Sequence, residues 1–206
     1  MRSKTLPWIM LLTALLLWKL IPYLQRAPLP KVETTYNQAA YTPKQTKLEP
    51  TDRPFTMGKY TVTPLARYQF VGVILSAESY SDDGSDISPI DWAMAWGRCA
   101  KPAVWKKIDI TQQARFYLWS VEEEDLDVVP PLEIITASSA NIHLIPAANV
   151  VPIIKRGHRG VVAELSGMLV KVTSADGFIW ASSLSRTDSG AGACELFYVE
   201  TVKYLE

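Results

Sequence analysis

Reactive side chains are scarce in this sequence, which has two histidines and two cysteines among 206 residues. Zinc sites of familiar spacing need pairs such as H-x-x-x-H or C-x-x-C, and the sequence contains neither. The nucleophile-elbow motif G-x-S-x-G, the P-loop and the dinucleotide-binding fingerprint are also absent. These absences exclude the enzyme classes that such motifs mark, and we expect neither a metal nor a cofactor.

An excess of positive charge is missing as well. The chain has 21 basic and 21 acidic residues. Four of the basic residues lie in the first 26 positions, where no acid occurs, which leaves 17 basic and 21 acidic groups in the remainder. Nucleic-acid binding relies on a basic surface that displaces counterions. We therefore expect no nucleic-acid partner.

One long apolar run is present, at residues 6–24, interrupted only by a threonine, a lysine and two prolines. As a helix these 19 residues would span roughly 28 Å, close to the hydrocarbon thickness of a bilayer. A signal-peptidase site of the A-x-A type is missing, because Gln25 stands two residues before Ala27. The run predicts a transmembrane signal anchor at residues 5–24 after a cytoplasmic N-terminus, residues 1–4. The alternative is a buried amphipathic helix of the folded domain.

The basic residues around this segment nearly cancel the positive-inside bias. A short leader with most of the chain behind it usually keeps its N-terminus in the cytoplasm. We therefore predict a single-pass protein of the bacterial inner membrane, with its soluble domain in the periplasm and the lipid bilayer as one partner.

Residues 25–54 contain five prolines and no glycine, and they lack a sustained period of 2 or 3.6. This composition is typical of a semi-extended tether. The folded body is expected at residues 55–206.

The clearest strand signal in the body is the alternating run at residues 160–172, with Gly167 as an expected bend or bulge. An Asp-Gly hairpin at residues 174–178 and two further alternating runs predict a three-stranded C-terminal meander. Residues 59–80 predict one or two strands, with Gly72 as a second bend point. Other expected elements are a short helix at residues 88–97, a helical turn at 103–107, a strand at 115–120, a helix at 132–137, a strand at 141–145 and a helical turn before Arg156.

Two pieces of the body resemble strands of OB-fold barrels. The pattern G-x-V-x-x-L-x-G-x-L-V-x-V, at residues 160–172, is similar to a bent barrel strand, and FVGVILSAESY, at residues 70–80, resembles an opening strand. The resemblance implies a mainly β (α+β) fold: an OB-like antiparallel barrel with short helical insertions, which the long separation of the two pieces requires.

A second resemblance is carried by SPIDWAMAWG, IDITQQARFYLW, SANIHLIPA and GAGACELFYVE behind a membrane anchor. This combination is similar to a family of uncharacterised bacterial membrane-anchored proteins. The resemblance implies a shared fold and location, and it assigns no activity or catalytic residue.

The sequence is compatible with an enzyme that uses catalytic carboxylates, because glycosidase-type catalysis needs only a few well-placed acids. His143 lies in an apolar strand-like run, so a hydrogen-bonded core histidine is the alternative to a catalytic one. The weak catalytic candidates are Asp91, Asp109, His143 and Asp188.

Binding candidates are Trp92, Trp96, Arg115 and Arg186. The two tryptophans stand four apart on the expected helix at residues 88–97, so they would face the same way. If any aromatic pair of the body is exposed, we expect this one, whereas the alternative use of each tryptophan is the core.

Cys99 and Cys194 are the only cysteines. In an oxidising compartment they can form one structural disulfide, and the alternative is that both are buried small apolar residues. Cys194 is expected at the start of a strand, inert rather than nucleophilic.

Two functions follow from these observations. The first is a membrane-anchored periplasmic interaction module that binds an envelope protein partner. The second is a membrane-anchored hydrolase that acts on a cell-envelope polymer. A deep pocket with shifted carboxylates would favour the hydrolase, and an exposed apolar patch would favour the interaction module.

Overall fold

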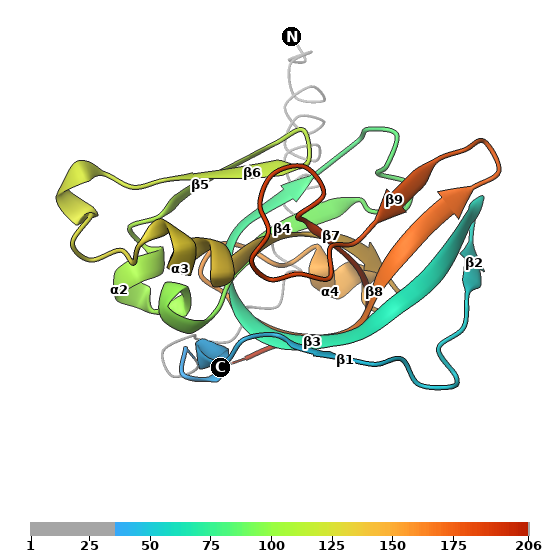
Figure 1. The fold of residues 1–206 in the computed structure, drawn as a ribbon, viewed down its shortest axis with the longest axis horizontal. Coiled ribbons are helices and arrows are strands. Elements are labelled where there is room, and N and C mark those ends of the chain that lie inside the picture. The colour runs from blue at the N-terminus through green and yellow to red at the C-terminus, as the bar shows by residue number, and fades with distance from the viewer. Residues whose placement is uncertain (1–35, 206) are drawn as a thin grey trace, which may run out of the picture. The chain divides into compact units, whose positions relative to one another are not determined.

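A computed structural model describes residues 36–205, which belong to one compact unit (Figure 1). The fold is mainly β, with 45% strand and 14% helix. An eight-stranded sheet partly closes on itself, and a separate two-stranded sheet lies beside it. The strands are β1 (Lys44–Thr46), β2 (Phe55–Met57), β3 (Tyr60–Ser79), β4 (Ile90–Ala95), β5 (Asp109–Gln113), β6 (Phe116–Ser120), β7 (Ser139–Pro146), β8 (Val162–Ser174), β9 (Ile179–Ala181) and β10 (Glu195–Tyr204). The helices are η1 (Gln38–Ala40), η2 (Gly97–Ala100), α2 (Pro102–Trp105), η3 (Glu123–Asp125), α3 (Leu132–Ala137) and α4 (Val151–Ile154).

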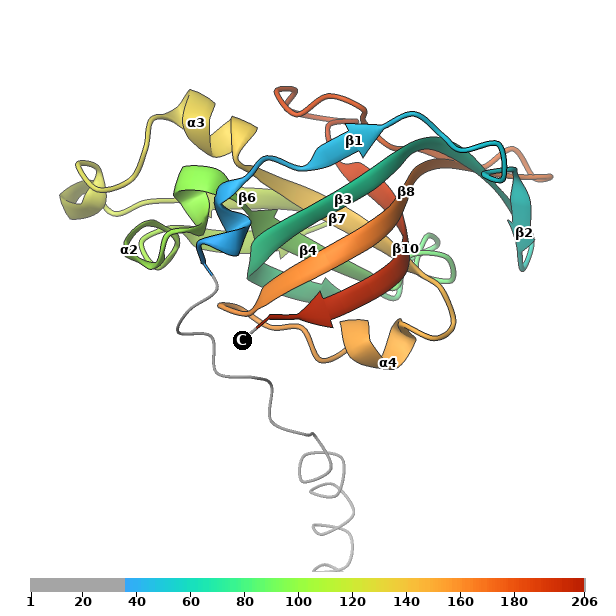
Figure 2. The ribbon, with the colours of Figure 1, turned by 90° about the horizontal axis from the view of Figure 1, so that it is seen from below.

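Five strands form a circuit of pairings. β3 is antiparallel to β4, and β4 is antiparallel to β7. β7 is parallel to β10, β10 is antiparallel to β8, and β8 is antiparallel to β3. Figure 2 shows β3, β8 and β10 side by side across one wall of this circuit. The pairing of β3 with β8 therefore closes the sheet.

The long strand β3 makes this closure possible. Its side chains alternate between buried and partly exposed over most of its 20 residues, which confirms the strand predicted at residues 59–80. It pairs with β8 as far as Val73 and with β4 from Val73 onward. At the neighbouring Gly72, a Cβ atom would lie 3.0 Å from the carbonyl oxygen of Ala95. Glycine thus allows close contact with β4 where β3 changes partner.

β8 confirms the alternating strand predicted at residues 160–172. The irregularity expected at Gly167 is also present, and it involves the neighbouring strand β10. The register between β8 and β10 shifts between Val199 and Thr201, and a Cβ atom on Gly167 would lie 2.0 Å from the carbonyl oxygen of Tyr198. Only glycine leaves room for the bulged strand at this point.

The helix predicted at residues 88–97 is wrong. This segment contains β4, the central strand between β3 and β7, and all six of its residues are buried. The expected capping residues Ser88 and Gly97 lie outside the strand. A short apolar run that is buried on both faces has no alternation, so periodicity cannot distinguish it from a buried helix.

The predicted C-terminal meander is also wrong. β9 returns along β8 as expected, pairing with Lys171–Thr173. β10, however, pairs with residues 163–169 of β8 and with β7, and it does not pair with β9. The two strands follow one another along the same edge of β8, and residues 182–194 connect them.

Residues 36–54, expected to belong to the tether, include η1 and β1. β1 pairs with residues 67–69 of β3, and Ala39 of η1 is fully buried. The sheet therefore includes chain on the N-terminal side of the expected boundary at residue 55. The predicted signal anchor at residues 5–24 and the first part of the tether lie outside the described residues. Within residues 36–205, no helix is long and apolar enough to span a membrane.

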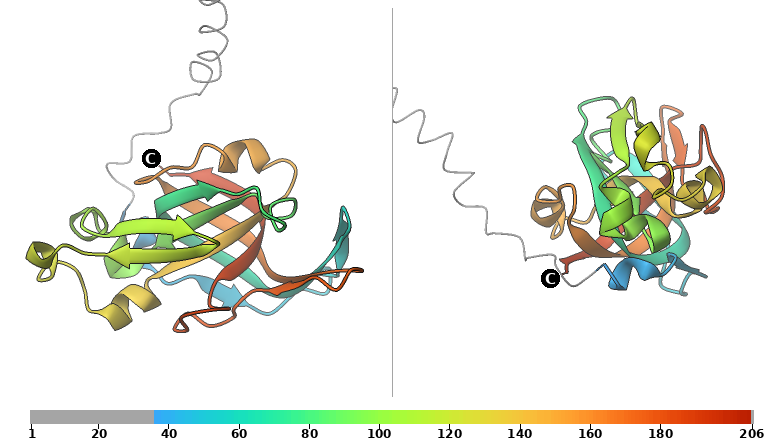
Figure 3. Two further views of the ribbon diagram at one scale, coloured as in Figure 1. Left: turned by 90° about the horizontal axis from the view of Figure 1, so that it is seen from above. Right: turned by 90° about the vertical axis from the view of Figure 1, so that its left-hand side faces the viewer.

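The segment between β4 and β7, residues 96–138, is a large insertion into the circuit (Figure 3). It contains α2, the hairpin β5–β6 and α3, and these agree with the predicted helical turn, strand and helix. β7 and α4 confirm the strand and helical turn predicted on either side of residue 148. A core cluster that includes Val73, Ala93, Ile108 and Ile135 joins the insertion to the sheet.

Candidate functional site: a groove beside the hairpin β5–β6

The hairpin β5–β6 has a tight two-residue turn. Gln113 pairs with Phe116, so Ala114 and Arg115 form the turn, with φ values of 49° and 69°. Such turns normally use Asn or Gly, because a positive φ costs an L-residue with a Cβ atom of order 1–3 kcal/mol. The surrounding structure must hold this strained turn in place.

Arg115 supplies that restraint. Its guanidinium donates to both carboxylate oxygens of Asp82, at 2.7 and 2.6 Å, and to Asp91 Oδ1 at 2.9 Å. It also donates to the carbonyl oxygen of Ser88 at 2.8 Å and lies 4.1 Å from the ring centroid of Tyr80. The hydrogen bonds from Arg115 lower the pKa of the Asp82 carboxyl. All three guanidinium nitrogens therefore have partners, and the tip of the hairpin is fixed to the eight-stranded sheet.

Asp91 also binds the next strand. Its Oδ2 lies 2.8 Å from His143 Nδ1, because Asp91 on β4 and His143 on β7 are direct cross-strand partners. Asn141, two residues earlier on β7, donates to the carbonyl oxygen of Arg115 at 2.9 Å and accepts from Gln112 at 2.7 Å. The hairpin is thus anchored by a buried polar network on β4 and β7.

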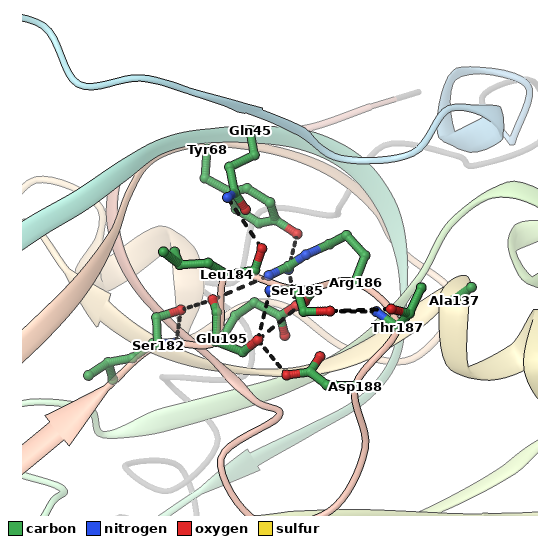
Figure 4. A network of polar contacts seen from close by, with 12 residues as sticks. Gln45, Tyr68, Ala137, Ser182, Leu184, Ser185, Arg186, Thr187, Asp188 and Glu195 are labelled. Atoms are coloured by element: carbon green, nitrogen blue, oxygen red, sulfur yellow. Dashed lines mark hydrogen bonds and ion pairs between the residues drawn. The ribbon is translucent and has the colours of Figure 1, made fainter.

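A second polar network organises the connection between β9 and β10, residues 182–194, which we name the 182–194 loop (Figure 4). Arg186 donates to Glu195 Oε1, to the hydroxyl of Tyr68 at 2.9 Å and to the carbonyl oxygen of Ser183 at 3.2 Å. The hydroxyl of Ser183 donates to Asp188 at 2.6 Å. The loop is therefore tied to β3 and β10 through one arginine.

Glu195 is the most perturbed acid of this network. Its side chain is 2% exposed, and burial raises its pKa to about 8, an effect that Arg186 partly opposes. Oε1 has the guanidinium of Arg186 as a partner, whereas Oε2 is buried without a hydrogen-bond partner.

Two neighbouring cavities lie between these networks. The first has a volume of about 280 Å³ and lies between β6 and the 182–194 loop, with Leu132 of α3 and Glu195 in its walls. The second has a volume of about 490 Å³ and is lined by Asp82–Gly84, Arg115, His143 and Trp180, among others. Phe116 and Cys194 line both cavities. We name the two cavities together the groove.

Apolar side chains are exposed at the first cavity. Phe116, Leu118 and Leu132 line it and are 49%, 65% and 58% exposed. Phe116 and Leu118 lie on β6, which pairs only with β5 among residues 36–205, so the other edge of β6 has free backbone donors and acceptors. The groove therefore offers both apolar surface and a strand edge.

The structure brings some of the predicted site residues together and separates others. Asp91, His143 and Arg115 form the first network, and Asp188 and Arg186 belong to the second. Asp109 is exposed at the start of β5 and lines a different cavity with His158. The three candidate acids therefore do not converge on one point.

Trp92 and Trp96 belong to the core, the alternative that the sequence left open for each tryptophan, and they do not form an exposed aromatic pair. The two side chains are 0% and 1% exposed, because they belong to the central strand β4 and its end rather than to a surface helix. Trp92 packs so closely against Gly157 that a Cβ atom there would lie 2.2 Å from the indole. Trp96 donates to the carbonyl oxygen of Ala137 at 3.2 Å and forms part of the wall of the first cavity.

Cys99 and Cys194 are free thiols in the structure, so the possible disulfide is not formed. Burial raises the pKa of Cys99 to about 11 and that of Cys194 to about 12. Both thiols stay protonated at neutral pH, which removes the thiolate that a nucleophile needs. Cys194 lies immediately before β10, as its sequence position predicted.

Sequence reasoning missed Glu195 and the exposed apolar residues that line the first cavity. Glu195 stands at the start of an alternating run, where an acid normally faces solvent. The sequence predicts a strand that contains Phe116 and Leu118, but nothing in it indicates that the two side chains line a cavity. The positive φ of Ala114 and Arg115 had no signal in the sequence, because neither residue is typical of a tight turn.

No protein-family model matches the chain, and no curated protein matches it. The resemblance to a family of membrane-anchored bacterial proteins stays a prediction. Within residues 36–205, no group of three or more His, Cys, Asp or Glu side chains is arranged to hold a metal ion.

Proposed function

We propose that this chain is a membrane-anchored periplasmic interaction module, an OB-like barrel whose groove binds an extended segment of an envelope protein. The observation that carries the proposal is the groove itself, where exposed apolar side chains of β6 stand beside a free strand edge.

The order of the strands supports the OB-like part of the proposal. The circuit β3–β4–β7–β10–β8 has one long bent strand that pairs at both ends, a parallel pair β7–β10, and a helix, α4, between β7 and β8. OB-fold barrels bind oligomeric ligands on the face of their second and third strands, between the loop after strand 1 and the loop after strand 4. The corresponding parts here are β4, β7, the loop with Asp82 and the 182–194 loop. Residues of β7, of both loops and Trp96, immediately after β4, line the groove.

The edge of β6 favours a protein ligand. An extended peptide can add a strand to a free edge, so that main-chain hydrogen bonds provide affinity and pockets for alternate side chains provide specificity. Phe116 and Leu118 supply exposed apolar area beside that edge, and exposed apolar patches of this kind mark interaction sites.

Photo-crosslinking in intact cells tests the proposal. A photoreactive amino acid replaces Leu118 in the full chain, and the control replaces Tyr41, which is 78% exposed and lines neither cavity. We expect position 118 to crosslink to one segment of one envelope protein, identified by mass spectrometry of the crosslinked peptide, and position 41 not to do so. The same products at both positions, or none at position 118, would contradict the proposal.

The alternative function is a hydrolase of an envelope polymer, and one observation favours it. Asp188 and Glu195 line the same cavity, and a carboxyl with a pKa raised to about 8 has the character of a general acid. Hydrolysis of purified envelope glycans or peptides that disappears in both Asp188→Asn and Glu195→Gln would support this alternative.

A further inference from the structure

The wall of the first cavity contains a buried carboxyl group whose hydrogen bonds are incomplete. Arg186, Asp188 and Glu195 all line this cavity, so it holds one guanidinium and two carboxyl groups. Arg186 satisfies Glu195 Oε1, but Oε2 of the same carboxylate has no partner although the side chain is 2% exposed. A buried acceptor without a donor is costly, so this oxygen is the place where the cavity lacks a group.

The side chains that pack around Glu195 do not supply that group. Tyr68 approaches from β3 and Tyr117 from β6, and burial raises the pKa of both phenols. The Cys194 thiol, which precedes Glu195 in the chain, has a pKa raised to about 12 by burial. These three groups are neutral at pH 7. The hydroxyl of Tyr117 lies 3.1 Å from Ser139, and that of Tyr68 accepts from Arg186.

We propose that the first cavity is a lysine subsite, in which Glu195 Oε2 accepts a hydrogen bond from the ammonium group of a side chain of the bound segment. This inference rests on the proposed function and names the chemistry that the groove recognises. An ammonium group brings one positive charge, which takes the place of the proton that the buried Glu195 carboxyl otherwise holds.

The lining of the cavity fits a lysine side chain. Phe116, Leu118 and Trp119 of β6 supply apolar surface, which suits the four-carbon stem, and Asp188 and Glu195 supply acidic groups. The ammonium has three donors, and a hydrogen bond to a buried carboxylate oxygen is of the strong, charge-assisted kind.

The ammonium would take the place of a proton. Burial raises the pKa of Glu195 to about 8, so in the empty cavity this acid is mostly protonated at pH 7. A cation binds the ionised form, so each bound lysine releases one proton below that pKa. The dissociation constant for lysine should therefore fall about tenfold for each unit of pH between 6 and 8, and level off above.

The test uses two small probes on the full chain in neutral detergent. The first is Nα-acetyl-lysine methylamide, and the second is the norleucine analogue, which has the apolar stem without the ammonium. Binding is followed by the indole N–H resonances of Trp96 and Trp119, which line the first cavity, with Trp92, which lines neither cavity, as the internal reference.

At pH 8 we expect the lysine probe to bind at least tenfold more tightly than the norleucine probe. Glu195→Gln should abolish both this preference and its pH dependence. The matched control Asp109→Asn removes an exposed carboxylate outside the groove and should change neither. Equal binding of the two probes at pH 8, or a preference that survives in Glu195→Gln, would overturn the lysine subsite.

The wild-type pH dependence needs no variant, so the test stands even if Glu195→Gln fails to fold. A preference that does not change between pH 6 and pH 8 would likewise overturn the assignment. If crosslinking at position 118 identifies a partner while the probes bind equally, only the lysine subsite fails. If the crosslinking fails while lysine binds through Glu195, the proposed protein partner fails instead.

Discussion

Arg115 and Arg186 stand in two networks that look alike but differ in one respect. Each guanidinium meets a carboxylate that is almost fully buried on a strand of the eight-stranded sheet, Asp91 on β4 or Glu195 on β10. Around Arg115 both oxygens of the carboxylate have a partner, since Asp91 Oδ1 accepts from Arg115 at 2.9 Å and Oδ2 accepts from Asn141 at 3.5 Å and lies 2.8 Å from His143 Nδ1. Around Arg186, Glu195 Oε2 and Arg186 Nε have none. The two networks therefore differ at their carboxylates: both oxygens of Asp91 have a partner, whereas one oxygen of Glu195 has none, and in this sense the Arg186 network is incomplete.

Removing Arg115 should have the largest effect, because it leaves the buried charge of Asp91 with only His143 and a long hydrogen bond from Asn141. We expect Arg115→Ala to lower the free energy of unfolding by about 3–5 kcal/mol, the usual cost of breaking a buried ion pair. Urea unfolding at pH 7 measures this loss. Arg98→Ala, a control at an exposed residue, should change it by less than about 0.5 kcal/mol. A loss below about 1 kcal/mol for Arg115→Ala would contradict a structural role for the Arg115 network.

The incomplete network should respond to pH. Glu195 has its pKa raised to about 8 in the folded chain, so the folded state holds a proton that the unfolded state has released. Its contribution to stability is complete below the unfolded pKa of about 4.3 and is lost as pH rises through the folded pKa. The loss amounts to about 1.4 kcal/mol for each pH unit in this window. Urea unfolding at pH 5, 6, 7 and 8 should show this decline in the wild type and a flatter profile in Glu195→Gln. Parallel profiles would mean that Glu195 is already ionised in the folded chain.

Relieving the strain in the β5–β6 turn should have a smaller effect, and it should raise the free energy of unfolding rather than lower it. Ala114 has a φ of 49°, where glycine is free of the Cβ clash. Ala114→Gly should therefore raise the free energy of unfolding by about 0.5–1 kcal/mol. Ala103→Gly is the matched control, because Ala103 is exposed in the helix α2, where glycine should lower stability by about 0.5–1 kcal/mol. A decrease in both variants would show that the turn carries no strain.

The exposed apolar residues at the first cavity should matter least for stability. Leu118 is 65% exposed, so Leu118→Ser should change the free energy of unfolding by no more than about 0.5 kcal/mol. The same variant should lose the partner that photo-crosslinking at a neighbouring groove position, Phe116, detects. A destabilisation above about 2 kcal/mol would mean that Leu118 belongs to the core and is not available to a ligand.

The sequence predicted the strands that alternate and failed where alternation was absent. β3 and β8 each have one face in the core and one facing outward over much of their length, so their period of two is visible. β4 is buried on both faces, so its apolar run lacks alternation and the sequence wrongly predicts a helix there. The path of β10 could not be predicted either, because its partners β7 and β8 are set by the closure of the whole sheet.

The candidate site was predictable only as separate residues. Asp91, His143 and Arg115 were each singled out, but they meet because β4 and β7 pair in one register and the hairpin β5–β6 folds back onto them. Glu195 could not be found, since its burial depends on the 182–194 loop covering the start of β10.

The parallel pair β7–β10 has a consequence for how the chain folds. β10 joins two strands that are made earlier, and its contacts with β7 span more than fifty residues of sequence. Distant pairings of this kind slow folding, because the entropy of closing a long loop is lost before the contacts form. Until residues 195–204 have been synthesised, β7 and β8 each lack a neighbour and expose a bare edge. We therefore expect truncated or stalled chains of this protein to aggregate, and the complete sheet to form late and in one cooperative step.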